Sequence, residues 1–252
     1  MRIKGIRDIF GIASPANLAP VECPKSFEAI ERDAELAIKH AEQARSSLQK
    51  FNDLLASKIG MEPASSVVMG TVKAKDRIIQ KAIARYDGDV TRVSDVSRSR
   101  MRIDSVSQVK SIKDALNSPD FKEGLEKKGV RILSVEDCFE TPKETGWRGI
   151  AIKTEIDLGK GRSQRAETII IPNGWFPSYE TTHVYLENSR RLKDLAKAQY
   201  RELSLSETIQ VDRYNTMSKE IHDDLARRDG YDVLESKPKK PQPVLESPDL
   251  SP

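Results

Sequence analysis

A long amphipathic stretch near the N-terminus constrains the fold of this chain more than any other feature. Between Ser26 and Ile59, apolar residues recur at spacings of three and four, which is the period of one buried helix face. Ser26 is a typical helix N-cap, and Gly60 is a typical stop. The pattern predicts one long helix or two, and an unbroken helix would be about 50 Å long at 1.5 Å per residue.

From Val67 onward the chain changes to short strands that alternate with helices. Three- and four-residue spacings predict helices over 76–86, 106–116, 121–128, 179–200 and 205–228. Two-residue alternation predicts strands over 98–104, 130–135, 148–156 and 166–171, the last two forming a hairpin around the polar turn 158–165. The expected class is α+β: a small mixed β-sheet flanked by helices, with helices at both ends.

The length of 252 residues fits one domain, which we expect over residues 25–228. Residues 1–24 contain three prolines and are predicted to be an extended N-terminal arm. Residues 229–252 are rich in proline and charge, which predicts a disordered Pro-rich tail.

Composition removes several classes of protein. No window approaches 18 consecutive apolar residues, so no transmembrane segment and no membrane partner are expected, and a cytoplasmic location is predicted, with a secreted effector or toxin as the alternative. Two separated cysteines and three scattered histidines rule out a disulfide framework and a structural zinc site. A net charge of +3 is too balanced to indicate duplex nucleic-acid binding. P-loop, dinucleotide-binding, zinc-protease and nucleophile-elbow motifs are also missing.

Two carboxylates and a row of arginines are the residues best suited to chemistry. Glu167 lies in an otherwise apolar strand, where a carboxylate needs a partner such as a divalent cation or a structural arginine. Asp95 precedes a strand whose alternation places Arg98, Arg100 and Arg102 on one face. Such a face is either a solvated edge or a cradle for a triphosphate.

Three further features have both a functional and a purely structural interpretation. Trp147 is suited to stacking on a purine base or to packing in the core. Lys73 and Lys81 are either phosphate ligands or ordinary surface lysines, and His183 is either a site residue or a helix-packing histidine. The basic run from Arg190 to Lys197 is either a solvated helix face or a candidate RNA-binding surface.

The order of these residues resembles the synthetase domain of the RelA/SpoT family, in the nucleotidyltransferase superfamily. The segment TVKAKDRIIQK retains the two lysines of a basic RxKxxxSxxxK motif, and SDVSRSR retains an Asp followed five residues later by Arg. DCFETPKETGWR matches a D-Y-I-x-x-P-K-x-N-G-Y-R segment through Asp137, Pro142, Lys143, Gly146 and Arg148, with Trp147 in the aromatic position. Glu167 and His183 reproduce the family's interval of sixteen residues. The resemblance covers roughly residues 70–190.

The resemblance implies a RelA/SpoT synthetase fold and the transfer of pyrophosphate from ATP to the 3′-hydroxyl of a nucleotide, most simply GDP or GTP. It implies that Asp95 and Glu167 hold Mg²⁺ and are catalytic, and that Lys73, Lys81, Arg98 and Arg100 bind ATP. The implied acceptor-binding residues are Trp147, Lys143, Arg148 and His183. In such a reaction, positioning and charge neutralisation supply most of the rate.

Three positions depart from the family pattern. The Gln of E-x-Q is Ile169, a His four residues after the aromatic is Ala151, and a Lys before the D-Y-I segment is Glu136. All three map to the acceptor side. Two alternatives therefore remain: a toxin-like enzyme that modifies tRNA 3′ ends or adenosine nucleotides, and a degenerate nucleotide-binding sensor without catalysis.

Overall fold

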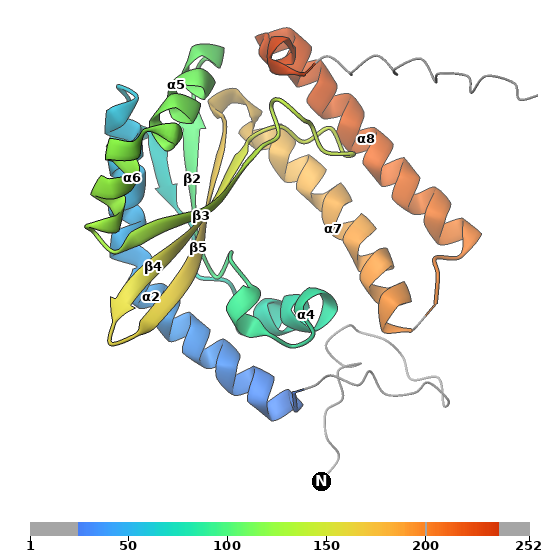
Figure 1. Cartoon of the computed structure of the whole chain (residues 1–252). Helices are drawn as coiled ribbons and strands as arrows, with labels where there is room; N and C mark the ends of the chain where they lie inside the picture. Colours follow the sequence, from blue (N-terminus) through green and yellow to red (C-terminus); the bar gives the residue numbers. More distant parts are fainter. Residues whose placement is uncertain (1–24, 200, 237–252) are drawn as a thin grey trace, which may run out of the picture.

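The computed structural model describes residues 25–199 and 201–236, which form a five-stranded mixed sheet with helices on both faces (Figure 1). The strands are β1 (Val67–Met69), β2 (Ser97–Ile103), β3 (Val130–Asp137), β4 (Ile150–Gly159) and β5 (Arg162–Pro172). Their order in the sheet is β1-β2-β5-β4-β3, with β2 and β5 parallel and the other neighbours antiparallel. The predicted α+β class with a small mixed sheet is confirmed. The predicted N-terminal arm lies outside the described residues.

The longer helices occur where hydrophobic spacing predicts them, whereas the four-residue helix Pro63–Ser66 was not predicted. They are α2 (Phe27–Lys58), α3 (Pro63–Ser66), α4 (Lys75–Tyr86), α5 (Val106–Asn117), α6 (Pro119–Glu126), α7 (Phe176–Ala198) and α8 (Leu205–Asp229), with short 3₁₀ turns η1 (Val90–Arg92), η2 (Asn173–Trp175) and η3 (Tyr231–Leu234). Helix α2 is a single helix of 32 residues, and the Ser26 hydroxyl caps it by accepting a hydrogen bond from the Ala29 amide (3.3 Å). The N-terminal pattern therefore produces one helix rather than two. None of the helices within the described ranges combines the length and the apolar character that a membrane span needs.

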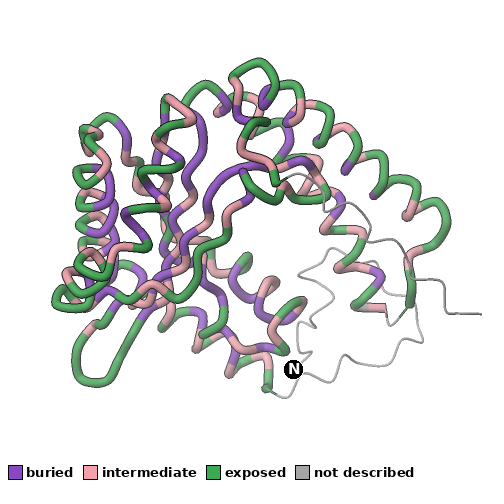
Figure 2. Tube along the Cα trace, turned by 45° about the horizontal axis from the view of Figure 1, so that its top comes forward, coloured by how far each residue is buried: buried purple, intermediate pink, exposed green. Residues whose placement is uncertain are grey.

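The two faces of the sheet differ in chemistry. One face is apolar and packs on α2, α5 and α6, forming the main core around Met101, Ile152, Ile170 and Phe51 (Figure 2). A second cluster packs α4 and η1 against the first half of α2. The opposite face carries Arg98, Arg100 and Arg102, as the alternation predicts. The charged face is therefore the side of the sheet on which a site can form.

A buried ring of three polar side chains fixes α2 to the centre of the sheet. Asn52 donates to the Ser99 hydroxyl (2.9 Å) and accepts from the Thr168 hydroxyl (2.9 Å), and the two hydroxyls are 2.8 Å apart. Ser99 and Thr168 are direct partners in the parallel pairing of β2 with β5. A slip of one residue would separate the two hydroxyls, so the ring also fixes the register of these strands.

The folded part of the chain extends beyond the predicted start of the tail at residue 229. Tyr231 is buried, its ring lies 5.3 Å from that of Phe139, and the Ser236 amide donates to the Glu140 carbonyl (2.9 Å). The tail prediction missed residues 229–236 because the residues that bury them come from distant parts of the chain. Residues 237–252 lie outside the described residues.

Replacing Asn52 tests the polar ring. We expect Asn52→Ala to lower the free energy of unfolding by about 2–4 kcal/mol, because it leaves two buried hydroxyls without their amide partner and creates a cavity. Gln49→Ala, about one turn earlier on the same helix, is the matched control; its side chain donates to Asp53, and its loss should cost less than about 1 kcal/mol. Urea unfolding measures both. Equal effects of the two substitutions would show that the ring contributes no special stability.

Candidate active site

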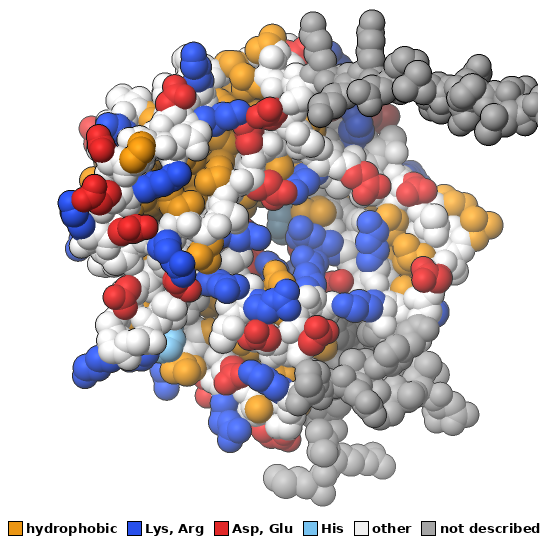
Figure 3. Space-filling model, in the orientation of Figure 1, with side chains coloured by type: hydrophobic (Ala, Val, Ile, Leu, Met, Phe, Trp, Pro, Cys, Tyr) orange, Lys and Arg blue, Asp and Glu red, His pale blue; other side chains and the backbone are white. Residues whose placement is uncertain are grey.

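A basic cleft of about 440 Å³ opens between α4 and α7. Its lining combines six cations with three carboxylates and two amides: Lys73, Arg77, Lys81, Arg85, Arg190, Arg191, Asp95, Glu187, Asp194, Gln80 and Asn188. Figure 3 shows Lys and Arg side chains gathered around a hollow in the middle of this face. An excess of positive charge in a concave site favours a phosphate-bearing ligand.

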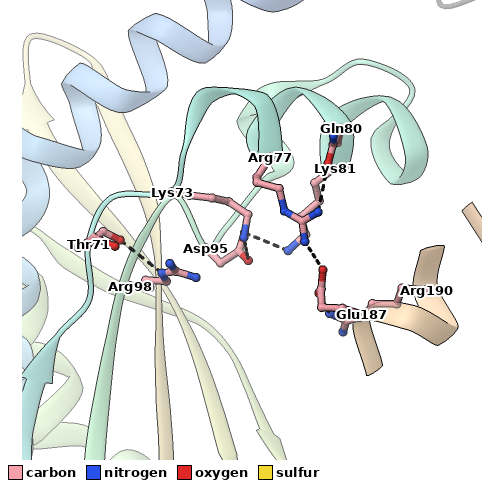
Figure 4. A network of polar contacts seen from close by, with 9 residues as sticks. All are labelled: Thr71, Lys73, Arg77, Gln80, Lys81, Asp95, Arg98, Glu187 and Arg190. Carbon is pink, nitrogen blue, oxygen red and sulfur yellow. Dashed lines mark hydrogen bonds and ion pairs between the residues drawn. The ribbon is translucent and has the colours of Figure 1, made fainter. Parts of the chain in front are cut away.

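The inner end of the cleft is organised by Asp95. Its two carboxylate oxygens contact the ammonium groups of Lys73 (2.9 Å) and Lys81 (3.0 Å), all three side chains being largely buried. Figure 4 shows the two lysines approaching Asp95 from the 70–74 segment and from α4. The Lys73 amide donates to the Val96 carbonyl (3.0 Å), which ties the lysine's backbone to the start of β2.

Burial and charge act against each other in this cluster. Burial alone would raise the pKa of Asp95, but the two lysines outweigh it and lower this pKa to about 2. The pKa of Lys73 is lowered on balance: burial is the largest influence and lowers it, Asp95 raises it, and Lys81 and Arg98 lower it further. Asp95 is thus fixed in its ionised form and holds two cations that would otherwise repel each other.

Glu167 lies beside this cluster on the charged face of the sheet. It is paired in register with Arg98 of β2 and Lys153 of β4. Its carboxylate nevertheless forms no hydrogen bond or ion pair within the described residues. Burial raises its pKa, the negative charge of Asp95 raises it further, and nearby lysines offset this in part. The structural ion pair with an arginine that the sequence left open is not formed.

The two carboxylates fit a divalent cation. Asp95 and Glu167 are close enough for the charge of one to perturb the other, and Glu167 has its full acceptor capacity free. Mg²⁺ is commonly held by one or two carboxylates together with substrate phosphates. No group of three or more His, Cys, Asp or Glu side chains suited to a metal occurs in the described part of the chain. A metal bound here would therefore take its remaining ligands from water and substrate.

Two of the four predicted ATP-binding residues lie in the cleft, and two lie beside it. Lys73 and Lys81 line the cleft. Arg98 is exposed next to Lys73 and donates to the Thr71 carbonyl (3.3 Å). The Arg100 guanidinium lies over the rings of Phe176 (4.9 Å) and Tyr179 (5.6 Å) and so anchors the start of α7 on the sheet.

His183 lies on the helix face that looks toward the site. Burial lowers its pKa, Glu187 raises it, and Arg190, Arg100 and Lys73 lower it. These charges come from α7, β2 and the 70–74 segment, so the exposed residue His183 lies within electrostatic range of both the cleft and the arginine-bearing strand. The chain interval from Glu167 to His183 thus brings both residues within range of Lys73.

Three of the four predicted acceptor residues, Trp147, Lys143 and Arg148, lie on the segment between β3 and β4, and the fourth, His183, lies on α7. Trp147 is half-buried over Gly149, and its buried indole nitrogen lies within interaction range of the Tyr179 hydroxyl on α7. Lys143 is exposed and pairs with Glu136. Arg148 is buried and directed away from the cleft, toward α8.

The three departures from the family pattern form one row across the sheet. Arg100 pairs with Ile169, Ile169 with Ala151, and Ala151 with Glu136. Each residue of this row lies two positions along its strand from the row that contains Glu167, so the two rows are neighbours on one face of the sheet. The changed row is the one nearer to the segment between β3 and β4. The changes are therefore concentrated in one place rather than scattered over the site.

Sequence reasoning missed the outer part of the cleft. Arg77 and Arg85 on α4 pair with Glu187 and Asp194 on α7, the second pair at 3.7 Å. The signal was present, since Arg77, Lys81 and Arg85 recur every four residues and so share one helix face. Only the position of α7 shows that this face lines a cleft.

Replacing Asp95 tests the ion-pair cluster. Because the folded-state pKa lies below the ordinary 3.8, ionised Asp95 stabilises the fold above pH 3.8, and this contribution is lost as the pH falls toward about 2. We expect Asp95→Asn to lower the free energy of unfolding by roughly 2 kcal/mol at pH 7, with a smaller difference below pH 4. Asp212→Asn, at an exposed site on α8, is the control in pH-dependent denaturation. A constant difference down to pH 2 would contradict the cluster.

We expect ionisation of Glu167 to affect the stability of the fold in the opposite way to ionisation of Asp95. Its folded-state pKa is raised above the ordinary 4.5, so its ionisation opposes folding at neutral pH and has no effect below about 4.5. We expect Glu167→Gln to melt at the same temperature as the parent or higher at pH 7.5, with the advantage disappearing near pH 4. Thermal melts across this range measure the effect. A clear loss of stability at pH 7.5 would show that Glu167 has a structural partner after all.

Comparison with known proteins shows a likeness in structure. No family model and no curated protein sequence matches this chain. The small alarmone synthetase 1 from Bacillus subtilis, in the structure bound to its product pppGpp, superposes with a TM-score of 0.50 at 14% identity over 79% of this chain and 97% of that one. A GTP pyrophosphokinase family protein from Streptococcus pneumoniae gives 0.48 at 15% identity over 83% and 98%. The chain therefore has the fold of a RelA/SpoT-type synthetase domain.

Proposed function

We propose that this protein is an ATP- and Mg²⁺-dependent pyrophosphokinase that transfers pyrophosphate to the 3′-hydroxyl of a nucleotide, with a guanosine nucleotide as the first expectation. The observation that carries the proposal is the pairing of Asp95 with Lys73 and Lys81 beside a carboxylate, Glu167, that forms no hydrogen bond or ion pair with the residues the structure describes. This arrangement lies at a basic cleft in a fold shared with a synthetase that is bound to its product pppGpp.

The donor triphosphate is assigned to the inner cleft. Lys73 and Lys81 are fixed by Asp95 at the point where phosphate charge has to be neutralised. Arg98 lies next to Lys73, and Arg77 extends the row of cations along α4. Such fixed cations stabilise the charge that develops on a transferring phosphoryl group without reorganising during the reaction.

Glu167 is assigned the proton of the attacking hydroxyl. The acceptor 3′-oxygen forms a bond to the β-phosphorus of ATP, the bond from that phosphorus to the bridging α,β-oxygen breaks, AMP leaves, and the hydroxyl proton passes to the Glu167 carboxylate. A carboxylate with a raised pKa is a better base for this step than an ordinary one. When bound by Asp95 and Glu167, Mg²⁺ would supply further charge neutralisation on the phosphate oxygens.

The acceptor is assigned to the side of Glu167 that faces the β3–β4 segment. Trp147 offers a ring for stacking, Lys143 lies on the same segment between β3 and β4, and His183 on α7 is the remaining residue assigned to the acceptor. The Bacillus subtilis protein of the same fold holds a guanosine product, which favours GDP or GTP here. The changed row of Ile169, Ala151 and Glu136 is the reason to test other acceptors.

A single acceptor panel tests the reaction. ATP labelled at the γ-phosphate is incubated with Mg²⁺ and GDP, GTP, AMP, ADP or tRNA, and label transfer is followed by chromatography. We expect transfer to GDP or GTP. Transfer only to adenosine nucleotides or tRNA would identify the toxin-like alternative, and ATP binding without any transfer would identify a nucleotide-binding sensor.

Glu167→Gln should abolish this transfer while the protein stays folded. Loss of general-base assistance alone costs about 10²–10⁴-fold in rate, and loss of a metal ligand adds to it. Glu155→Gln is the matched control, because Glu155 lies on the same sheet face but pairs with Arg131. Rates per folded molecule, with the melting temperature measured in parallel, decide the outcome. A Glu167→Gln protein with parental activity would remove Glu167 from the reaction.

A further inference from the structure

Arg148 has its hydrogen-bonding groups taken up by the C-terminal part of the chain. The side chain is 4% exposed, and one terminal nitrogen contacts Asp223 of α8 (2.9 Å) and donates to the Gly146 carbonyl (2.8 Å). Its Nε donates to Glu235 (3.1 Å), and its other terminal nitrogen also pairs with Glu235. Little donor capacity remains for a ligand.

The segment that carries Arg148 also rests directly on the backbone of α8. Gly146 has a φ of +72°, and a Cβ built there would lie 2.8 Å from the Lys219 Cα. Only a glycine permits both this backbone conformation and this close approach. On the other side of Arg148, a Cβ at Gly149 would lie 2.9 Å from the Trp147 ring, so the absence of a side chain lets the indole lie over this position.

Further contacts hold the C-terminal end of α8 and the residues that follow it against the rest of the protein. The Trp175 indole donates to Asp229 (2.7 Å), and the Tyr231 ring packs on both Phe139 and Trp175. The Ser236 amide donates to the Glu140 carbonyl (2.9 Å). The chain from Lys219 to Ser236 is therefore held to the β3–β4 segment at both ends, and the ion pairs of Arg148 lie between them.

We propose that Arg148 is a positioning residue, which with Asp223 and Glu235 forms a clasp that holds Trp147 where it meets the acceptor nucleotide. The assignment of the acceptor rests on the proposed function, whereas the clasp itself rests on the contacts above. Arg148 does not touch the acceptor. Loosening the clasp affects acceptor binding through the position of Trp147 and leaves the ATP cleft between α4 and α7 unchanged.

Asp223→Asn tests the clasp. It removes the charge that faces Arg148 without changing the size of the side chain. We expect the KM for the acceptor found in the panel to rise about tenfold, with the KM for ATP changed less than about twofold, since small displacements of a positioning group have effects of this size or larger. Asp224→Asn is the matched control, because Asp224 is its exposed neighbour and forms a surface pair with Arg227 (3.6 Å).

A second readout does not depend on transfer. Trp147 and Trp175 are the two tryptophans, and Trp175 is 1% exposed, so acrylamide quenching of fluorescence reports mainly on Trp147. We expect quenching to increase in Asp223→Asn and to stay at the parental value in Asp224→Asn. If Asp223→Asn does not fold, Glu235→Gln replaces it, because Glu235 lies at the more exposed end of the clasp.

The two readouts separate failure of the clasp from failure of the proposed function. If the parent protein transfers pyrophosphate but the clasp variant keeps both the acceptor KM and the quenching of the parent, the clasp is overturned and the reaction stands. A lower melting temperature with both values unchanged also overturns it, since that is a purely structural effect. If the parent transfers nothing to any acceptor, quenching alone decides: increased exposure of Trp147 supports the clasp, and unchanged exposure rejects it.

Discussion

The parallel pairing of β2 with β5 is the constraint on which the rest of the site depends. These strands are distant in sequence, and their pairing brings the turn that carries Asp95 next to Glu167. Parallel strands require a crossover connection. Here the connection from β2 to β5 consists of the helices α5 and α6 followed by the strands β3 and β4. The ring of Asn52, Ser99 and Thr168 lies on the buried side of this pairing and fixes its register. A slip of one residue would turn Glu167 toward the core.

The carboxylates on the functional side of the molecule are held in ion pairs, although the cleft as a whole keeps an excess of positive charge. Asp95 balances two lysines, while Glu187 and Asp194 balance Arg77 and Arg85 across the cleft. Glu167 is the exception, since it is largely buried, has a raised pKa and forms no ion pair among the described residues. Carboxylates of this kind are typical of functional sites, because structural carboxylates at similar depth usually have a partner.

The C-terminal helix has a larger part in the architecture than its position at the edge of the fold suggests. It packs along α7, and its last turns support the segment that carries Trp147 (Figure 1). Helix α7 forms one wall of the basic cleft, and α8 lies behind both that wall and the proposed acceptor segment. One helical hairpin thus connects the two halves of the candidate site.

The sequence by itself determined the elements and their faces, because these depend on local spacing. The helix from Ser26, the arginine face of β2 and the hairpin after Ile150 all follow from periods of 3.6 and 2, and motif order brought Asp95, Glu167 and Lys73 to one expected site. Other features were decided only by the tertiary structure, because they depend on contacts between residues that are far apart in the sequence. Arg148 is indistinguishable from a ligand-binding arginine until Asp223 and Glu235 are placed against it, and Tyr231 is a tail residue until Phe139 and Trp175 bury it. No local pattern records such pairings, because ion pairs and ring contacts are set by the packing of whole elements rather than by neighbouring residues.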